Sequence, residues 1–536
     1  PKGFPTTQFS MVEAEDVGLY KFDILSQRGL GHIRDAVELV AQRTGERIDI
    51  HEVKRFTKDP VIKQMLRTGD TIGCFYVESP AMRMLMRKMQ VDDYKGLVAA
   101  SSIIRPGVSN SGMMREFLLR YHDPERRKLA PKKLYELMPD TFGVMVYQED
   151  VIKVGYEYAG LTLAEADSLR RSMSGKFRNR KEFSEVKESF FKGALERGNP
   201  LPEVEELWTQ IESFGEFSFA KGHSASYAVE SYQSLYLKAH HPMEFLVGVA
   251  NNFGGFYHTE FYLHEAKRIG ATIEAPCVNT SEGYCTLHDK RIFLGLRNIK
   301  SLEEGAAQLI QNERQRSGPF MDLQDLLRRV PLHMEQARVL ARVGALRFTG
   351  RSKPQLLWDL AMLHHGRSDV ARNEELFMTK VADPKLPELN HYPLADAYDE
   401  LDLLGFPLCD PFSLVDRPEG HEPPANGFSS AQPEVILARQ MGSYLRKRVE
   451  MLGYMIHVKA TDTHTGQRMS FGSFIDTAGD FWDSTQFPDV AARFPFRGRG
   501  VYRLVGHVEE EFGHCSLRTQ FMEKLPWRAD PRYGEK

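Results

Sequence analysis

The sequence has few cysteines, no long apolar run and no signal peptide. Its five cysteines lie far apart among 536 residues, without a C-x-x-C pair. This spacing argues against a disulfide framework or a zinc ribbon and is typical of a reducing cytosol. The richest apolar runs, such as Leu246 to Ala250, fall far short of the roughly 18 residues of a membrane-spanning helix. We therefore expect a cytoplasmic protein.

The chain also lacks a net charge large enough to predict a nucleic-acid partner. Its 70 basic and 73 acidic residues give a formal charge of −3. Locally, however, one stretch of twelve residues contains six basic residues and no acidic one: Arg170, Arg171, Lys176, Arg178, Arg180 and Lys181. A basic helix end is often a solvated cap that complements the helix dipole, but six cations exceed that need. Phosphate binding and a solvated face both stay open for this stretch.

Familiar nucleotide and metal motifs are missing as well. No P-loop occurs, and Gly498-Arg499-Gly500 lacks the third glycine of a dinucleotide-binding loop. The pairs His240-His241 and His364-His365 have no acidic or cysteine partner at ligand spacing. We expect these histidines at surfaces or helix ends rather than on a metal.

Periodicity and composition divide the chain into five parts. They are an extended segment (1–32), a helical region (33–265), a region of shorter helices (266–366), an irregular connector (367–436) and a β-rich region (437–536). The last part of the connector, residues 416–436, is expected to be a linker. The expected helices include Ile33 to Arg43, Met82 to Met89, Val146 to Tyr158 and Tyr227 to Lys238. The expected strands are Met451 to Val458, Arg468 to Ile475, Gly500 to Val508 and Cys515 to Met522. The fold class is therefore α+β and multidomain, with a C-terminal β-barrel for which an OB-fold is the leading candidate.

Two segments carry charged residues that suit phosphate chemistry. If Leu19 to Leu25 forms a strand, Lys21 and Asp23 share one of its faces. They would then form a surface ion pair or, if buried, a phosphate contact beside a metal ligand. In the second segment Thr162 to Glu165 forms a capping box, and Arg170 and Arg171 project from the flanks of the helix that it starts.

A third segment, Lys221 to Ser226, precedes an expected helix. Glycine and serine before a helix leave free amides, which bind anions readily. Tyr227, Tyr232 and Tyr236 follow on that helix, and such spacing favours core packing over base stacking.

These segments, in this order, resemble one family, the bacterial C-family DNA polymerases, which are the alpha subunits of DNA polymerase III. The matching stretches are Val17 to Leu25 (VGLYKFDIL), Gly73 to Lys88 (GCFYVESPAMRMLMRK), Ile104 to Gly107 (IRPG), Phe142 to Ile152 (FGVMVYQEDVI), Ala159 to Met173 (AGLTLAEADSLRRSM) and Phe219 to Phe245 (FAKGHSASYAVESYQSLYLKAHHPMEF). The similarity continues more weakly through 255–279 and 294–346, and it looks greatest to the shorter, error-prone branch.

The resemblance implies a fold and a set of site residues. Residues 1–32 would be the last part of the palm, 33–265 the fingers, 266–366 a helix-hairpin-helix region and 437–536 the OB-fold. Asp23 matches the third of three palm aspartates that hold two Mg²⁺ ions, and Lys21 matches a triphosphate contact beside it. The fingers residues that match contacts to the incoming nucleotide are Arg105, Arg170, Arg171, Lys176, Lys221, His223 and Ser224. Phosphoryl transfer needs metals and cations of this kind.

The sequence departs from the family pattern in three places. The 22 residues before Asp23 contain no Asp-x-Asp motif, so we expect a carboxy-terminal fragment that adds no nucleotide on its own. Ser301 and Glu303 stand where the hairpin should have glycines, so it should fold but bind DNA poorly. Gln355 to Leu360 (QLLWDL) is a poor match to a clamp-binding peptide.

The β-rich region is expected to bind single-stranded DNA weakly. Arg497 and Arg499 lie near a glycine turn where they could follow phosphates, and Arg178, Arg180 and Lys181 of the fingers are further candidate DNA contacts. The rings suited to base stacking are Phe471, Phe481, Trp482 and Tyr502, although most barrel aromatics fill the core.

The sequence thus predicts a DNA-directed DNA polymerase that transfers nucleotides to a primer 3′-end by a two-metal mechanism, in error-prone or translesion repair synthesis in the bacterial cytoplasm. The expected partners are primer-template DNA, deoxynucleoside triphosphates and either a sliding clamp or accessory repair proteins. The alternative is a non-catalytic nucleic-acid-binding or scaffolding protein that retains the polymerase carboxy-terminal half. The sequence upstream of residue 1 would discriminate between them.

Overall fold

The computed structural model describes residues 8–20, 22, 27–104, 112–172, 180–213, 220–366, 389–416, 433–463 and 466–533. The first part is helical. It holds α1 (Met11–Asp16), α2 (Arg28–Thr44), α3 (Val53–Phe56), α4 (Pro60–Thr68), α5 (Pro80–Met89), α6 (Tyr94–Ile103), α8 (Met113–His122), α9 (Pro124–Arg127), α10 (Lys132–Leu137), η1 (Pro139–Thr141), α11 (Gln148–Lys153), η2 (Val154–Tyr158), α12 (Leu163–Ser172), α13 (Arg180–Glu196), α14 (Leu201–Ser213), α15 (Lys221–His240), α16 (Pro242–Asn251) and α17 (Thr259–Arg268).

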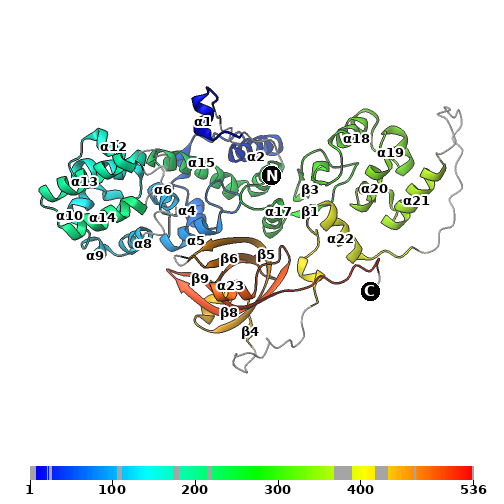
Figure 1. The fold of residues 1–536 in the computed structure, drawn as a ribbon. Coiled ribbons are helices and arrows are strands. Elements are labelled where there is room, and N and C mark those ends of the chain that lie inside the picture. Colours follow the sequence, from blue (N-terminus) through cyan, green and yellow to red (C-terminus); the bar gives the residue numbers. More distant parts are fainter. Residues whose placement is uncertain are drawn as a thin grey trace.

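Helix α15 is the central element of this helical part (Figure 1). Every residue from Ser231 to Lys238 is buried. Lys238 can be buried because its Nζ donates to Glu265 at 2.9 Å and to Asp70 at 3.2 Å, and a buried cation needs such partners. Helices α8 to α14 gather at one end of the molecule, beyond the end of α15 that begins at Lys221.

A second group of elements lies at the opposite end (Figure 1). It comprises β1 (Thr272–Glu274), β2 (Thr286–His288), β3 (Arg291–Phe293), η3 (Leu296–Asn298), α18 (Glu304–Ser317), α19 (Leu323–Arg329), α20 (Met334–Arg342), η4 (Arg347–Thr349), α21 (Lys353–Gly366), α22 (Pro393–Leu403) and η5 (Pro411–Leu414). Strand β3 lies between β1, which is parallel to it, and the antiparallel β2. The connector predicted as irregular therefore contains a helix, α22, whose buried Asp399 accepts from Arg342 of α20 at 2.9 Å.

The C-terminal region is a closed barrel. It consists of β4 (Glu434–Val435), η6 (Ala438–Tyr444), β5 (Arg448–Asp462), β6 (Arg468–Ile475), β7 (Phe481–Gln486), α23 (Pro488–Arg493), β8 (Val501–Glu511) and β9 (His514–Lys524). The strands follow the order β5-β6-β7-β9-β8, and β8 pairs back with β5. A five-stranded closed Greek-key barrel is the architecture of an OB-fold, so the predicted fold class is confirmed.

The barrel packs firmly against the helical part. Tyr454, Ile456 and Ile475 on the outside of the barrel belong to the same continuous hydrophobic core as the helices. Lys88 of α5, which is 5% exposed, forms an ion pair with Glu511 at the β8–β9 turn. The barrel is therefore not a loosely attached module.

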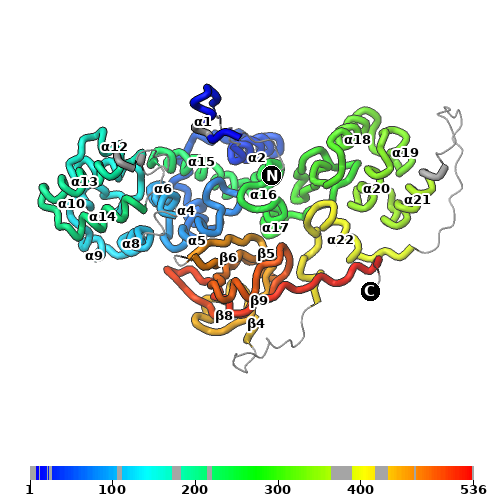
Figure 2. Tube along the Cα trace, viewed as in Figure 1, coloured from blue at the N-terminus to red at the C-terminus, as the bar shows by residue number. Residues whose placement is uncertain are grey.

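The chain beyond β9 returns to the connector. The Arg528 N–H donates to the Leu414 carbonyl at 2.8 Å, Trp527 forms a β-bridge with Val415, and Arg532 pairs with Asp399 of α22 at 2.9 Å. Figure 2 shows this terminal segment, drawn in red, running from the barrel to α22. The two ends of the barrel region thus meet.

Several predicted elements differ from the structure at their ends. Helix α2 begins at Arg28, five residues before the predicted start at Ile33. Helix α15 begins at Lys221 and therefore includes the residues predicted to precede it. The described residues of the segment 17–25 (17–20 and 22) form no strand. The segment 433–436 predicted as linker contains β4, which pairs with β5.

Candidate functional site

Many residues predicted for the site lie outside the described part of the chain. They are Lys21, Asp23, Arg105, Lys176 and Arg178. Arg180 and Lys181 open α13, but their side chains are also outside the described set. Arg170, Arg171, Lys221, His223 and Ser224 remain to define the site.

Arg170 and Arg171 lie on the last turn of α12. The predicted capping box starts this helix, because the Thr162 N–H donates to Glu165 at 2.8 Å and the Glu165 N–H donates to the Thr162 hydroxyl at 3.2 Å. Both guanidinium groups contact one carboxylate: Arg170 Nε lies 2.9 Å from Asp167 Oδ1 and Arg171 Nε lies 3.1 Å from Oδ2. The first two cations of the basic stretch are thus compensated by an acid one turn upstream.

Lys221 is the first residue of α15, and its backbone already holds an anion. Its N–H donates to both carboxylate oxygens of Glu149, at 3.0 and 2.9 Å. Its ammonium donates to Asp140 Oδ2 at 3.0 Å, and this hydrogen bond holds the pKa of Asp140 below its usual range. The amide donor predicted to bind an anion at this helix start is therefore present, but the Glu149 carboxylate already accepts from it.

Arg170 and Lys221 both contact residues at the start of α11. Arg170 Nη1 donates to Gln148 Oε1 at 3.4 Å, and Gln148 is the neighbour of Glu149. Because these two residues are in the first turn of α11, Arg170 and Lys221 come to the same place. We call Arg170, Arg171 and Lys221 the fingers cluster; their side chains are 30%, 62% and 46% exposed, so an anion can reach them.

His223 and Ser224 differ in their access to this cluster. The His223 ring is partly exposed and lies 4.1 Å from the Tyr227 ring. Ser224 is fully buried and its hydroxyl is 2.7 Å from that of Ser102 on α6. Ser224 therefore packs α15 against α6, a placement that does not favour the predicted triphosphate contact. Tyr232 is buried, as the core interpretation of the tyrosines predicts.

The acidic partners Asp140, Glu149 and Asp167 were missed by sequence reasoning. The pairing of Asp167 could have been predicted from sequence, since it lies three and four residues before the two arginines, the spacing of side chains that meet on a helix. Glu149 and Asp140 lie 72 and 81 residues from Lys221, so no local pattern connects them to it.

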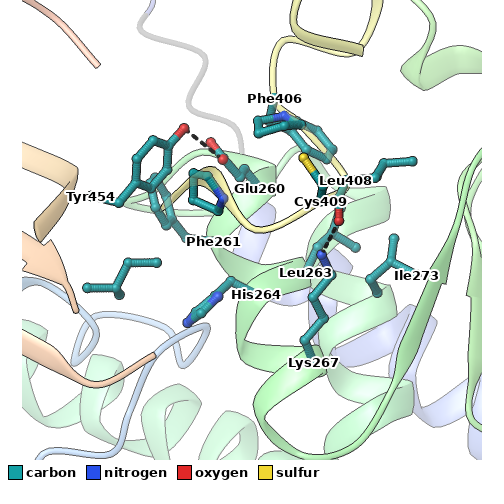
Figure 3. A pocket seen from close by; sticks show the side chains of 13 residues that line it. Glu260, Phe261, Leu263, His264, Lys267, Ile273, Phe406, Leu408, Cys409 and Tyr454 are labelled. Atoms are coloured by element: carbon teal, nitrogen blue, oxygen red, sulfur yellow. Dashed lines mark hydrogen bonds between the residues drawn. The ribbon is translucent and has the colours of Figure 1, made fainter. Parts of the chain in front are cut away.

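The barrel arginines predicted to contact DNA have different surroundings. Arg497 is exposed, whereas Arg499 Nη1 donates to Glu260 Oε2 at 3.1 Å and to the Gly405 carbonyl at 3.2 Å. Glu260 of α17 also accepts from the Tyr454 hydroxyl at 2.9 Å, and Figure 3 shows these two side chains pointing toward each other. Arg499 thus joins the barrel to the helical part, which argues against the predicted DNA contact.

We call the contact of Arg499 and Tyr454 with Glu260 the joint between the barrel and α17. The cavity beside this joint is too small for a nucleotide. Its volume is about 40 Å³, enough for a few water molecules. Burial raises the pKa of Glu260 to about 7, while Arg499 and the Tyr454 hydroxyl act in the opposite direction. The Glu260 carboxyl therefore has a structural role, and its protonation state changes near neutral pH.

Most barrel rings predicted to stack on bases are not available. Trp482 and Tyr502 are buried in the barrel core, where Trp482 stacks on Phe474 with ring centroids 4.7 Å apart. Phe481 lies under the Arg83 guanidinium at 4.7 Å. Only Phe471 of the four is exposed, at 42%.

The helix-hairpin-helix turn keeps its fold although its glycines are replaced. Ser301 has a φ of +66°, a conformation that favours glycine, as expected at a position where the family has one. The Glu303 N–H donates to Gln336 Oε1 at 2.9 Å, and the Lys300 N–H donates to the Leu403 carbonyl at 2.7 Å. Because these amides already have protein partners, the geometry supports the expectation of poor DNA binding.

Metal, disulfide and membrane features can be judged only for the described residues. Within those ranges, no three His, Cys, Asp or Glu side chains are grouped as a metal site. All five cysteines are described and free, as predicted. No described helix has the length and apolar character needed to cross a membrane.

Comparison with known proteins places the chain in a family. Residues 29–198 match the family described as the bacterial DNA polymerase III alpha subunit finger domain, and residues 270–356 match a helix-hairpin-helix motif. The chain is 32% identical to the DNA polymerase III subunit alpha of Aquifex aeolicus over 367 residues, which cover 67% of this chain and 31% of the relative. The corresponding protein of Staphylococcus epidermidis is 29% identical over 512 residues (94% and 46%), and that of Thermus aquaticus is 31% identical over 421 residues (76% and 33%).

The fold and the matched finger domain are those of a bacterial DNA polymerase III alpha subunit fragment. The chain belongs to the bacterial C-family DNA polymerases, the DNA polymerase III alpha subunits. It spans about a third to a half of the length of the curated relatives it matches.

Proposed function

We propose that the chain supplies the nucleotide-binding fingers, the helix-hairpin-helix region and the barrel of a DNA-directed DNA polymerase. The observation that carries this proposal is the fingers cluster, which lies inside or next to the matched finger domain and brings two arginines and a lysine from separate helices to one exposed place.

Each member of the cluster has a role that follows from its geometry. Arg170 and Arg171 are held side by side by Asp167, so their guanidinium groups form a planar, multidentate donor surface for phosphate oxygens. Lys221 adds a point charge at the start of α15, while its backbone amide is already held by the Glu149 carboxylate. The incoming triphosphate would bind here while its base pairs with the template, and the cations would stabilise charge on the phosphates during transfer.

The metal part of the proposal rests on the resemblance. Asp23 remains the proposed Mg²⁺ ligand, with Lys21 beside it, but both lie outside the described residues. The described residues present no carboxylate cluster that fits two ions, so we derive no catalytic step through a metal. When bound, Mg²⁺ would neutralise the phosphates and activate the primer hydroxyl.

Nucleotide binding tests the proposal directly. A fluorescent deoxynucleoside triphosphate should bind the chain in the presence of primer-template DNA. Each charge-assisted hydrogen bond contributes about 1.5–3 kcal/mol, so the double substitution Arg170→Ala/Lys221→Ala should weaken nucleotide binding by at least about 100-fold. Lys128→Ala is the matched control, because Lys128 is an exposed lysine that pairs only with its near neighbour Glu125.

The catalytic outcome separates the two candidate functions. The chain alone should extend no primer, because two-metal transfer needs carboxylates from more than one position and only Asp23 is assigned. Unchanged nucleotide affinity in the double variant, together with DNA binding, would instead support the non-catalytic nucleic-acid-binding or scaffolding alternative.

The finer assignment, error-prone or translesion repair synthesis with a sliding clamp or accessory repair proteins as partners, rests on the resemblance alone. Bypass of an abasic template site by a protein that includes this chain and the remaining palm carboxylates is its test. Extension that stops at every abasic site would assign the protein to accurate replication instead.

A further inference from the structure

The Glu149 carboxylate binds the first amide of α15 without a cation to balance its charge. Both of its oxygens accept from the Lys221 N–H, at 3.0 and 2.9 Å. No described residue forms an ion pair with Glu149. A carboxylate on a helix-start amide is a favourable contact, because the hydrogen bond is charge-assisted and the helix dipole attracts anions. Since no cation fixes this carboxylate, however, another anion can take its place.

Asp140, the other acidic partner of Lys221, is bound differently. One of its carboxylate oxygens accepts from the Lys221 ammonium at 3.0 Å and the other from the Lys95 ammonium at 3.3 Å. The Lys221 side chain also lies against Tyr147, with its Nζ 5.2 Å from the ring centroid. Asp140 is thus balanced by two cations, whereas Glu149 is the acidic partner that an incoming anion can displace.

The start of α15 has room for such an anion. Lys221 and Gly222 are exposed, and Glu149 is partly exposed. Apart from the backbone of its own helix and its chain neighbours, no described atom lies within 4 Å of the position that a Cβ on Gly222 would take. The Arg170 guanidinium reaches Gln148, the neighbour of Glu149, at 3.4 Å. A phosphate that replaced the carboxylate would therefore meet the Lys221 N–H beside the cations of the fingers cluster.

We infer that the Glu149 carboxylate is an internal competitor of the incoming nucleotide: it occupies the position at the start of α15 that a phosphate of the nucleotide takes, so that binding exchanges one anion for the other. The inference rests on the proposed nucleotide-binding function and describes how the same site is regulated. A single phosphate gains little by displacing a carboxylate from this amide. A triphosphate can displace it and still contact Arg170 and Arg171 through its other phosphates.

An exchange of this kind has two consequences for the site. The first N–H groups of a helix have no acceptor within the helix itself, and Glu149 supplies one for Lys221 while no nucleotide is bound. The same carboxylate lowers the affinity for every anion that needs this amide, which includes inorganic phosphate and the pyrophosphate that nucleotidyl transfer produces. Glu149 therefore keeps the site formed when it is empty and favours release of the product.

The test measures binding of a fluorescent deoxynucleoside triphosphate to the full chain with primer-template DNA, and its displacement by inorganic phosphate. Glu149→Gln keeps the size of the side chain and removes its charge. Because a neutral amide competes less well for the Lys221 N–H, the variant should bind the triphosphate about 10-fold more tightly. The inhibition constant of inorganic phosphate should fall by about the same factor. Glu125→Gln is the matched control, because it removes the same charge from an exposed side chain that pairs with Lys128, and it should change neither value.

A second variant separates exchange at the amide from a general loss of negative charge. Glu149→Asp keeps the charge but shortens the side chain by one methylene, which draws the carboxylate back from the Lys221 N–H. If anions exchange at this amide, Glu149→Asp should also bind the triphosphate more tightly. The gain of Glu149→Gln should then persist at about 300 mM salt, where exposed charges more than about 8 Å apart are largely screened. Circular dichroism melting verifies that each variant is folded.

The outcomes distinguish the inference from the function on which it rests. If Arg170→Ala/Lys221→Ala weakens nucleotide binding but neither Glu149 variant tightens it, Glu149 only caps α15, and the inference is wrong while the proposed function stands. A gain by Glu149→Gln that disappears in salt, with Glu149→Asp at wild-type affinity, also contradicts the exchange. Binding that appears only in the Glu149 variants would support it. If neither the wild-type chain nor the Glu149 variants bind nucleotide, the nucleotide site and its competitor are both wrong.

Discussion

The basic residues of the fingers and those of the barrel belong to the same charge class but have opposite surroundings. In the fingers cluster the guanidinium and ammonium groups contact partly exposed carboxylates and stay open to solvent. In the barrel, Arg503 is only 6% exposed and lies between Glu450 and Glu523. From the number of arginines alone, the two regions would look like equally good candidates for anion binding. The difference teaches that access to the cation, rather than its presence, separates a ligand site from a structural joint.

The largest expected effect is on the stability of the barrel. Arg503→Ala removes the cation between two carboxylates at 2.7 and 3.0 Å, and breaking a buried pair costs about 3–5 kcal/mol. Arg518→Ala, which removes an exposed pair with Glu509, should cost only about 0–1 kcal/mol. Denaturant unfolding followed by barrel tryptophan fluorescence measures both, and equal effects would erase the contrast between the two regions.

The second effect depends on pH at the joint. Burial raises the pKa of Glu260 from an ordinary value of 4.5 to about 7, so between these pH values the folded chain keeps a proton that the unfolded chain has lost. Stability should therefore fall as pH rises through this window, by at most about 3.5 kcal/mol, since one pKa unit corresponds to about 1.4 kcal/mol. The difference in unfolding free energy between wild type and Glu260→Gln should change over pH 4.5–7 and be constant above it. A constant difference throughout would contradict this titration.

The third effect tests the assignment of Arg499 to the joint. Arg499→Ala should lower the free energy of unfolding by about 1.5–3 kcal/mol, the contribution of a hydrogen bond to a charged group. It should leave the salt slope of DNA binding unchanged, because the guanidinium is already held by Glu260 and the Gly405 carbonyl. A lower salt slope with unchanged stability would return Arg499 to the DNA surface predicted from sequence.

The smallest effect per residue concerns the basic stretch outside the described residues. Replacing Lys176, Arg178 and Arg180 by glutamate should reduce the salt slope of DNA binding by up to about three units, at 0.7–0.9 for each phosphate contact. Binding isotherms between about 50 and 200 mM salt provide the slopes. If the slope and the nucleotide affinity both stay the same, the stretch is a solvated face.

The fold could be predicted where the side-chain pattern is regular. Strand β6 has the predicted bounds, Arg468 to Ile475, and α5 begins only two residues before the predicted helix. Strand β7 was missed because its inward residues Ser484 and Gln486 are polar, so the sequence shows no alternation of apolar and polar residues.

The site could be predicted only for contacts within one element. Arg170 and Arg171 follow from the capping box and the helix that it starts. The contacts of Lys221 with Glu149 and Asp140, and that of Arg499 with Glu260, join residues 72 to 239 positions apart. Such pairings arise from tertiary packing, and no local pattern specifies them.

The β-bridge between Val415 and Trp527 brings the two ends of the barrel region together. The chain enters and leaves this region at one point, and the Arg532–Asp399 pair reinforces that point from the C-terminal side. A protease cut between residues 417 and 432 would therefore leave two pieces that stay associated, held by the bridge, the ion pair and the shared hydrophobic core.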